Sequence, residues 1–297
     1  MSNISKIITF LFFIFSSATL GQSQSVHHHD PLDNMPIIER LPTGFAGTSP
    51  IEQRGAEYRK FLAASVKIGV NNASGSGTIV YYDPEKKLAY VASCGHLWSR
   101  GVLSAEESSR KNLTANIIVW YHNDKKLDAP RTYSAKVIFY SYIDGQDTSL
   151  LTFSPDWNPN YFPVAQSNYE YKAGQHAHSL GCDRGGEVAH YDIEMLGIGG
   201  NDLVTQQNSP RPGRSGGGLM DDYGYYIGTC WGTQYVDGSG KGYFTPLSVI
   251  HKFWNQQNYG FLLNKKPNVE ANKIPIFDRN GKQGKYNSDY VLLPMAG

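Results

Sequence analysis

Short stretches of apolar or alternating residues recur through the middle of the chain, separated by turn residues such as Asp144-Gly145 and Gly199-Gly200. Strands are expected at residues 65–70, 75–82, 87–94, 116–121, 133–140, 148–153, 175–180, 188–196, 202–206, 217–220, 225–231 and 242–245. Short strands in such a series are typical of β-sandwiches and β-barrels. The sequence therefore predicts an all-β protein.

Helices are expected at only two places. Leu247, Ile250 and Phe253 recur at helical spacing just after Pro246, and a shorter helical pattern spans residues 51–64. The composition agrees with this prediction, because the 297 residues include 20 Tyr and 31 Gly and only 18% are charged. With 27 basic and 26 acidic residues, the chain has no long-range attraction to nucleic acid or anionic lipid.

The two ends of the chain differ from its middle. In residues 1–21, Lys6 is followed by a short apolar run and then by small residues, which is the order of a secretory signal peptide and too short for a membrane anchor. We therefore expect a secreted or periplasmic protein, and no later segment is long and apolar enough to span a membrane. Residues 22–60 and 265–297 are expected to be extensions of one domain at 61–264.

Cysteine and histidine give no metal or redox signature. The three cysteines Cys94, Cys182 and Cys230 allow one disulfide at most, and no Cys-x-x-Cys spacing occurs. His176 and His178 alternate on a predicted strand, but no further ligands are evident, so we expect no metal site there. No nucleotide-binding fingerprint is present either, and no cofactor is expected.

Three segments carry residues suited to nucleophilic catalysis. His96 follows a buried-looking strand, Asp147 precedes an apolar strand, and Ser215 lies among glycines that let the backbone turn and present N–H groups. Each feature alone is ordinary. Together they give histidine, acid and serine in that order, 51 and 68 residues apart.

The chain resembles the trypsin-like serine proteases of the chymotrypsin fold. Its motifs are more similar to those of the bacterial high-temperature-requirement branch than to those of the digestive trypsins. Five motifs between about residues 65 and 258 carry the resemblance: Ser74-Gly75-Ser76-Gly77-Thr78, Cys94-Gly95-His96, Asp147-Thr148-Ser149-Leu150-Leu151, Gly213-Arg214-Ser215-Gly216-Gly217 and Tyr226-Ile227-Gly228-Thr229-Cys230-Trp231-Gly232. The resemblance implies two six-stranded antiparallel β-barrels that meet near residues 155–172, followed by a C-terminal helix. It also implies a serine-type endopeptidase that acts on proteins or peptides.

The resemblance assigns roles to the three residues. Ser215 is expected to be the nucleophile, His96 its general base, and Asp147 the acid that orients the histidine. The backbone N–H groups of Gly213 and Ser215 would form the oxyanion hole. Asp144 is the rival acid, but its Asp-Gly pair is a turn signal, whereas Asp147 fits the family motif.

The substrate pocket follows by the same resemblance. Ser209 would lie at its base, Trp231 on its lining strand, and Gly232 and Gly242 on its walls. Because residue 209 is not an acid, we expect a preference for small or medium uncharged side chains.

Two residues depart from the family pattern. Arg214 stands where digestive enzymes have an aspartate that pairs with a freed N-terminal amine, and two cations cannot make that pair. Cys230 replaces a serine that supports the catalytic aspartate, and its thiol is a weaker donor. By the resemblance, Cys94 and Cys230 lie close together, which leaves a disulfide or two buried thiols as alternatives.

Three other functions remain to be weighed. A catalytically silent homologue acting as a binding module is one, given the unusual Arg214 and Cys230. Gly213-x-Ser215-x-Gly217 also fits the elbow of α/β-hydrolase esterases, but that motif needs a following helix and leaves only His251 as base. A cysteine nucleophile at Cys94 is less favoured because Cys94 and His96 are neighbours on one strand.

Overall fold

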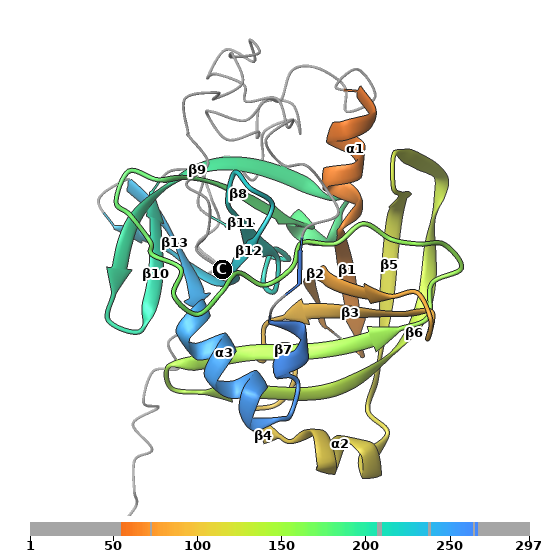
Figure 1. Ribbon diagram of the computed structural model, residues 1–297. Helices are drawn as coiled ribbons and strands as arrows, with labels where there is room; N and C mark the ends of the chain where they lie inside the picture. Colours follow the sequence, from red (N-terminus) through yellow and green to blue (C-terminus); the bar gives the residue numbers. More distant parts are fainter. Residues whose placement is uncertain (1–54, 72, 207–209, 237–238, 264, 267–297) are drawn as a thin grey trace, which may run out of the picture.

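The computed structural model describes residues 55–71, 73–206, 210–236, 239–263 and 265–266. These residues form two antiparallel barrels that lie side by side (Figure 1). Residues 1–54, which include the expected signal peptide, and most of the C-terminal extension lie outside the described residues. No helix in the described ranges is long and apolar enough to cross a membrane.

The first barrel is a six-stranded sheet closed on itself. Its strands follow the order β6-β5-β1-β2-β3-β7, and a β6–β7 pairing closes the ring. The bounds are β1 (Ser65–Val70), β2 (Ala73–Asp83), β3 (Leu88–Ser93), β5 (Thr114–His122), β6 (Lys125–Ile143) and β7 (Gln146–Phe153). Closure works because β6 is long enough to pair with β5 over its first part and with β7 over its last part. A short strand, β4 (Gly101–Leu103), pairs with the end of β6.

The second barrel is also closed and six-stranded, in the order β10-β13-β12-β11-β8-β9. The bounds are β8 (His176–Gly181), β9 (Ala189–Gly199), β10 (Asp202–Gln206), β11 (Gly218–Met220), β12 (Tyr226–Val236) and β13 (Ser239–Pro246). The all-β fold with two six-stranded barrels is therefore confirmed. The link between the barrels runs from the end of β7 at Phe153 to the start of β8 at His176.

Alternation of side chains explains why these segments become barrel walls. Along β5, Ala115, Ile117 and Val119 are buried while Thr114 and Asn116 are exposed, as expected for a strand with one face in the core. Strand β7 differs, because every residue after Gln146 is buried. It lies between the first barrel's interior and the rest of the molecule.

The helices are α1 (Gly55–Ala63), α2 (Ala105–Lys111) and α3 (Leu247–Gln256), with short 3₁₀ turns η3 (Asp183–Gly185) and η4 (Gly260–Leu262). Helix α3 leaves the second barrel and packs on the first, beside β7 (Figure 1). The ring of Phe253 lies edge-on to that of Phe139 at 5.4 Å, and the indole N–H of Trp254 donates to Thr148 Oγ1 at 3.3 Å. The C-terminal helix thus holds the two barrels together next to Asp147.

Candidate active site

His96 lies in a tight turn directly after β3. The N–H of Trp98 donates to the carbonyl of Gly95 at 3.0 Å, which closes the turn. A Cβ on Gly95 would lie 1.9 Å from the carbonyl oxygen of Ser141, so only glycine lets the chain pass this close to β6. The His96 side chain is partly buried, with 23% of its surface exposed.

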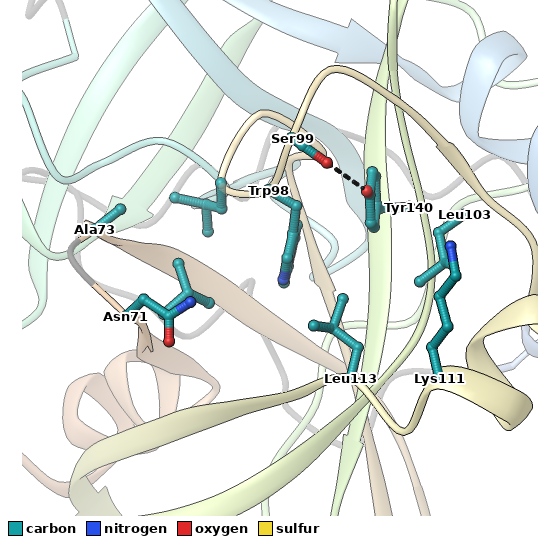
Figure 2. A pocket seen from close by; sticks show the side chains of 10 residues that line it. Asn71, Ala73, Trp98, Ser99, Leu103, Lys111, Leu113 and Tyr140 are labelled. Atoms are coloured by element: carbon teal, nitrogen blue, oxygen red, sulfur yellow. Dashed lines mark hydrogen bonds between the residues drawn. The ribbon is translucent and has the colours of Figure 1, made fainter.

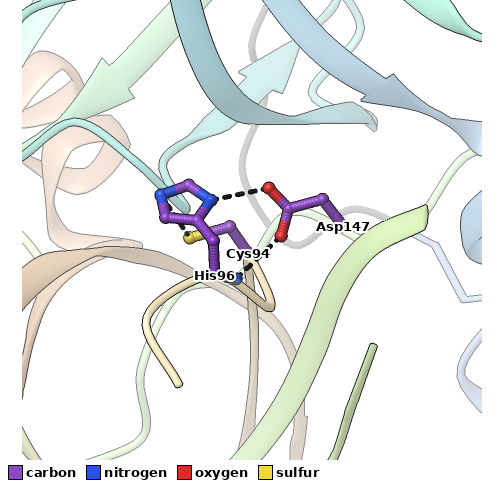
Figure 3. Close-up of side chains that lie close together, drawn as sticks. All are labelled: Cys94, His96 and Asp147. Carbon is purple, nitrogen blue, oxygen red and sulfur yellow. Dashed lines mark hydrogen bonds and ion pairs between the residues drawn. The ribbon is translucent and has the colours of Figure 1, made fainter. Parts of the chain in front are cut away.

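Asp147, at the start of β7, holds the histidine through three hydrogen bonds (Figure 3). Its Oδ2 accepts from Nδ1 of His96 at 2.6 Å, and its Oδ1 accepts from the backbone N–H groups of Gly95 at 2.5 Å and His96 at 2.9 Å. The carbonyl of Asp147 accepts from Thr245 Oγ1 of the second barrel at 2.8 Å. This arrangement fixes the ring and keeps the proton of neutral His96 on Nδ1, so that Nε2 is free to act as a base.

The rival acid, Asp144, lies elsewhere. Its carboxylate binds Arg100 at 2.9 Å, and its side chain is 95% exposed. Of the two acids, only Asp147 contacts His96.

The environment of His96 favours its protonated form. Burial disfavours the charged ring, but the negative field of Cys94 and of Asp147 and the hydrogen bond to Asp147 outweigh this, so the pKa of His96 is raised well above its usual value. Burial also raises the pKa of the Cys94 thiol, so the sulfur carries little charge at neutral pH. We therefore assign the raised pKa of His96 chiefly to the carboxylate of Asp147.

The loop that carries Ser215 docks on the same end of the first barrel. The carbonyl oxygen of Ser215 accepts from the N–H of Ser76 on β2 at 2.7 Å, and the N–H of Gly216 donates to the carbonyl of Cys230 at 2.7 Å. A Cβ on Gly216 would lie 2.1 Å from Ser93 Oγ and 3.1 Å from the backbone nitrogen of Cys94. The loop can approach Cys94, two residues before His96, only because residue 216 is glycine.

The backbone on either side of Ser215 presents two N–H groups. The carbonyl of Pro212 accepts from the N–H of Arg184 at 2.5 Å, and the carbonyl of Arg214 accepts from the N–H of Gly217 at 2.8 Å. In a trans peptide the N–H points opposite to the carbonyl, so the N–H groups of Gly213 and Ser215 point away from these partners. Neither N–H donates a hydrogen bond within the described part of the chain. Both are available to bind an oxyanion.

One expected contact is absent. No hydrogen bond joins Ser215 Oγ to Nε2 of His96 among the described residues; instead, Sγ of Cys94 lies 3.6 Å from that nitrogen (Figure 3). This contact was not expected between residues so close in the chain, but the turn after β3 folds the ring of His96 back over the sulfur of Cys94. Hydrogen bonds between nucleophile and base are often long in enzymes without substrate.

The structure contains three free, buried cysteines, Cys94, Cys182 and Cys230, and so has the second of the two expected arrangements, buried thiols without a Cys94–Cys230 disulfide. The sulfur of Cys94 faces the ring of His96.

A buried ion pair behind the Ser215 loop was missed by sequence reasoning. The side chain of Arg214 is completely buried, its Nε donates to Asp183 Oδ1 at 2.8 Å, and its Nη1 donates to the carbonyl of Ser179 at 3.1 Å. Its guanidinium carbon also lies 3.6 Å from the ring centre of Tyr191. Arg214 therefore pairs with an acid of its own barrel, as a completely buried arginine requires.

The predicted pocket residues are described in part. Ser209 lies outside the described residues. Gly232 on β12 has no atom within 4 Å of where a Cβ would be, so it borders open space, whereas Gly242 on β13 backs against Thr205 and Pro210. The indole N–H of Trp231 donates to Asp202 Oδ1 at 3.1 Å. Asp202 was not expected at this position from the sequence.

A pocket lies beside the turn that carries His96. This pocket has a volume of about 480 Å³, and Leu97 and Trp98, which follow His96, form part of its wall (Figure 2). The ring of Trp98 stacks on that of Tyr140 at 5.6 Å, and Leu97 reaches the space beside Gly75 and the carbonyl of Ser215. The pocket is thus an apolar surface next to the Ser215 loop.

Two six-stranded barrels, with a His–Asp pair from the first and a glycine-flanked serine loop from the second, are the architecture of the trypsin-like serine proteases. Among solved structures, the chain is similar to the crystal structure of Deg5, with 16% identity, a TM-score of 0.50, and coverage of 69% of this chain and 93% of that one. It is also similar to the serine endoprotease from Yersinia pestis, with 15% identity, a TM-score of 0.50, and coverage of 71% and 67%. At this identity the similarity shows the fold. No family model and no curated protein sequence matches the chain.

Proposed function

We propose that the protein is a serine endopeptidase. The observation that carries the proposal is the His96–Asp147 pair, fixed by three hydrogen bonds, just after β3. The Ser215 loop docks there with two N–H groups that have no acceptor among the described residues. A histidine held in this tautomer, a serine and a pair of backbone donors are the parts that acyl transfer needs.

In the proposed reaction, Ser215 Oγ attacks the carbonyl carbon of the scissile bond while Nε2 of His96 takes the hydroxyl proton. The N–H groups of Gly213 and Ser215 bind the oxyanion, and one such donor lowers the barrier by about 3 kcal/mol. His96 then gives its proton to the leaving amine. A water molecule, activated by the same nitrogen, hydrolyses the acyl-enzyme and restores Ser215.

The proposal extends to location and substrate. The order of residues 1–21 supports secretion, and the fold supports protein or peptide substrates. The absence of an acid at residue 209 supports a preference for small or medium uncharged side chains.

A catalytically silent homologue is the second candidate. The observation that favours it is the sulfur of Cys94 at 3.6 Å from Nε2 of His96, without a hydrogen bond to that nitrogen from Ser215 in the described residues. An α/β-hydrolase esterase is not supported, because Ser215 is followed by the β11–β12 hairpin and not by a helix. His251, the base that this alternative requires, is buried and bonds the carbonyl of Ala165.

Labelling with a fluorophosphonate probe tests the proposal. We expect the secreted full chain to be labelled, the Ser215→Ala variant to be unlabelled, and a matched Ser109→Ala variant, altered at an exposed serine of α2, to label as the parent does. A positional-scanning peptide library then gives the cleavage preference. A folded parent protein that neither labels nor cleaves any peptide contradicts the proposal and favours the silent homologue.

A further inference from the structure

A cluster of two histidines and one aspartate lies in the second barrel, away from the residues of the proposed mechanism. Nδ1 of His176 lies 2.7 Å from Oδ1 of Asp222, and Nε2 of His178 lies 3.1 Å from the same oxygen. The three ligand atoms all lie within 4.8 Å of one another.

Strand pairing explains how these residues meet. His176 and His178 alternate on β8, so both side chains face the same side of the strand. Strand β11 pairs antiparallel to β8 with Met220 opposite His178, and the same register continued by two residues brings Asp222 opposite His176. A sequence separation of more than 40 residues therefore becomes a direct contact.

The turn that carries Asp222 is held rigidly. The neighbouring carboxylate of Asp221 accepts from the backbone N–H groups of Tyr223 at 3.0 Å and Tyr225 at 2.8 Å, and Asp221 is itself buried. These hydrogen bonds hold the turn in shape and so fix the position of Asp222.

A third histidine orients the cluster from behind. Nε2 of His190, on β9, lies 3.0 Å from Nδ1 of His178, and both rings are almost fully buried. If the proton of neutral His178 is on Nδ1, it is donated to His190, and Nε2 carries a lone pair toward Asp222. Histidines that bind metals donate the other ring N–H to an acceptor, usually a carboxylate, a backbone carbonyl or water, and His190 occupies that place here.

The cluster is not sealed from solvent. About a quarter of the His176 and Asp222 side chains is exposed, which leaves a path for an ion and its water.

We propose that Nδ1 of His176, Nε2 of His178 and Oδ1 of Asp222 bind one divalent transition-metal ion of the zinc type. Two imidazole nitrogens and one carboxylate oxygen suit zinc and not magnesium or calcium, which prefer oxygen ligands alone. Tetrahedral ligand atoms about 2.0–2.1 Å from zinc lie roughly 3.3 Å apart. The separations of 2.7 and 3.1 Å therefore need to widen by about 0.6 and 0.2 Å.

The ion would join β8 to the β11–β12 turn, with water as its fourth ligand. It takes no part in the chemistry of His96 or Ser215, so the inference does not depend on the proposed function. The other group of metal-ligand atoms in the described residues, Cys94, His96 and Asp147, contains a sulfur. A measurement that detects a sulfur neighbour of the bound ion therefore tells which of the two groups holds it.

Zinc titration of the chelator-stripped protein, in competition with a chromophoric chelator, tests the site. The background carries His27→Gln, His28→Gln and His29→Gln, because that histidine run would bind zinc itself. We expect one zinc ion per chain in this background and loss of binding in His176→Gln and in Asp222→Asn. His190→Gln should weaken binding by about 10–100-fold. His122→Gln, which alters a histidine of β5 stacked on Trp157, is the matched control and should bind as the background does.

X-ray absorption of the zinc-loaded background gives a second readout that needs no variant. Nitrogen and oxygen neighbours at about 2.0–2.1 Å support the site, whereas a sulfur neighbour at about 2.3 Å assigns the ion to Cys94 and overturns the proposal. Absence of zinc binding, or binding unchanged in both His176→Gln and Asp222→Asn, also overturns it. The cluster would then be a hydrogen-bonded network only.

Discussion

Arg214 and Asp183 form an enclosed ion pair directly behind the loop that carries Ser215, with Nε of the arginine 2.8 Å from Oδ1 of the aspartate. Burial opposes the charge of the guanidinium, but the attraction of Asp183 outweighs it and raises the pKa of Arg214. The peptide bond between Arg214 and Ser215 also carries the Ser215 N–H, one of the two proposed oxyanion donors. The pair therefore ties the backbone of the proposed oxyanion hole to η3.

Breaking this pair should destabilise the protein and impair catalysis. Arg214→Met leaves Asp183 charged and uncompensated in the interior, so we expect a loss of about 3–5 kcal/mol of unfolding free energy, measured by urea denaturation. If Arg214 positions the oxyanion hole, kcat should fall more than KM rises in the fraction that stays folded. Asp183→Asn, added to Arg214→Met, should recover part of the stability because it removes the unpaired charge.

Arg100→Gln is the matched control for that experiment. Arg100 pairs with Asp144 at 2.9 Å, close to the 2.8 Å of the buried pair, but both side chains are exposed, and exposed pairs contribute about 1 kcal/mol or less. Equal losses in Arg214→Met and Arg100→Gln would contradict the structural importance of the buried pair.

Gly213 should tolerate no side chain. Its φ is +89°, and a Cβ there would lie 2.6 Å from the carbonyl oxygen of Cys182 and 2.7 Å from the backbone nitrogen of Gly185. Gly213→Ala must therefore move the peptide whose N–H would bind the oxyanion. Because one oxyanion donor is worth about 10²–10³-fold in kcat, we expect a loss of that order in peptide hydrolysis.

Gly200→Ala separates this effect from simple backbone strain. Gly200 also has a positive φ, of +64°, but nothing lies within 4 Å of its would-be Cβ. This variant should lose some stability and keep its kcat. A similar fall in kcat in both variants would count against the role of Gly213.

The pH dependence of hydrolysis should reflect the environment of His96. The base must be neutral to accept the proton of Ser215, so kcat/KM falls as pH drops through the pKa of His96. Because the carboxylate of Asp147 raises this pKa, the acid limb should lie above the value of about 6.5 of an isolated imidazole. Asp147→Asn should move the limb to lower pH and reduce kcat about 10⁴-fold, while Asp144→Asn changes neither. An acid limb of the parent protein below pH 6 would be inconsistent with the geometry.

The sequence predicted the strands well because a barrel wall imposes a local pattern. All twelve expected strands occur, since alternation such as that of Ala115, Ile117 and Val119 is present in the sequence itself. Strand β4 and helix α2 were missed. Three residues are too few to show a period, and α2 depends on its cap, in which Ser104 Oγ accepts from the N–H of Glu107. The Ser-x-x-Glu pattern of this cap is visible in the sequence and could have predicted the start of α2.

Contacts across strands could not be predicted in the same way. Asp183 meets Arg214, and Asp222 meets His176, only because β8, β9 and β11 adopt one particular register. A shift of one residue would turn His176 to the opposite face of β8 and would displace the loops that carry Asp183, Arg214 and Asp222. The direction of the Cys94 sulfur depends on one side-chain rotamer in a tight turn, and no sequence pattern predicts that rotamer. Motifs in the sequence could therefore identify His96, Asp147 and Ser215 as candidates. They could not identify the residues that contact these segments from other strands and loops.

The thiol content of the protein offers an inexpensive check on Cys94 and Cys230. The structure has three free, buried cysteines, and burial raises the pKa of all three thiols. A thiol reagent should therefore label none of them in the native protein and all three in denaturant without reductant. Mass mapping of the labels identifies the residues. Labelling of Cys182 alone in denaturant, with Cys94 and Cys230 labelled only after reduction, would restore the disulfide.

Asp221 and Asp222 should affect stability in opposite directions as pH changes. Burial, together with the charge of Asp222, raises the pKa of Asp221 to about 7, against the hydrogen bonds from Tyr223 and Tyr225. A carboxyl whose folded pKa is raised loses stability as pH rises from its unfolded pKa of about 4 toward 7, by up to about 4 kcal/mol for a shift of this size. Asn can still accept from the two N–H groups. Asp221→Asn should therefore gain stability relative to the parent protein between pH 4 and 7.

Asp222→Asn provides the contrast. The folded pKa of Asp222 is depressed, so its charge contributes stability above pH 4 that is lost as pH falls further. The variant should be less stable than the parent protein throughout the neutral range and approach it only in acid. Both comparisons are made by urea denaturation with excess chelator, so that a bound metal does not alter the unfolding midpoint. An Asp221→Asn advantage that stays constant from pH 4 to 8 would show that the carboxyl of Asp221 does not titrate in this range.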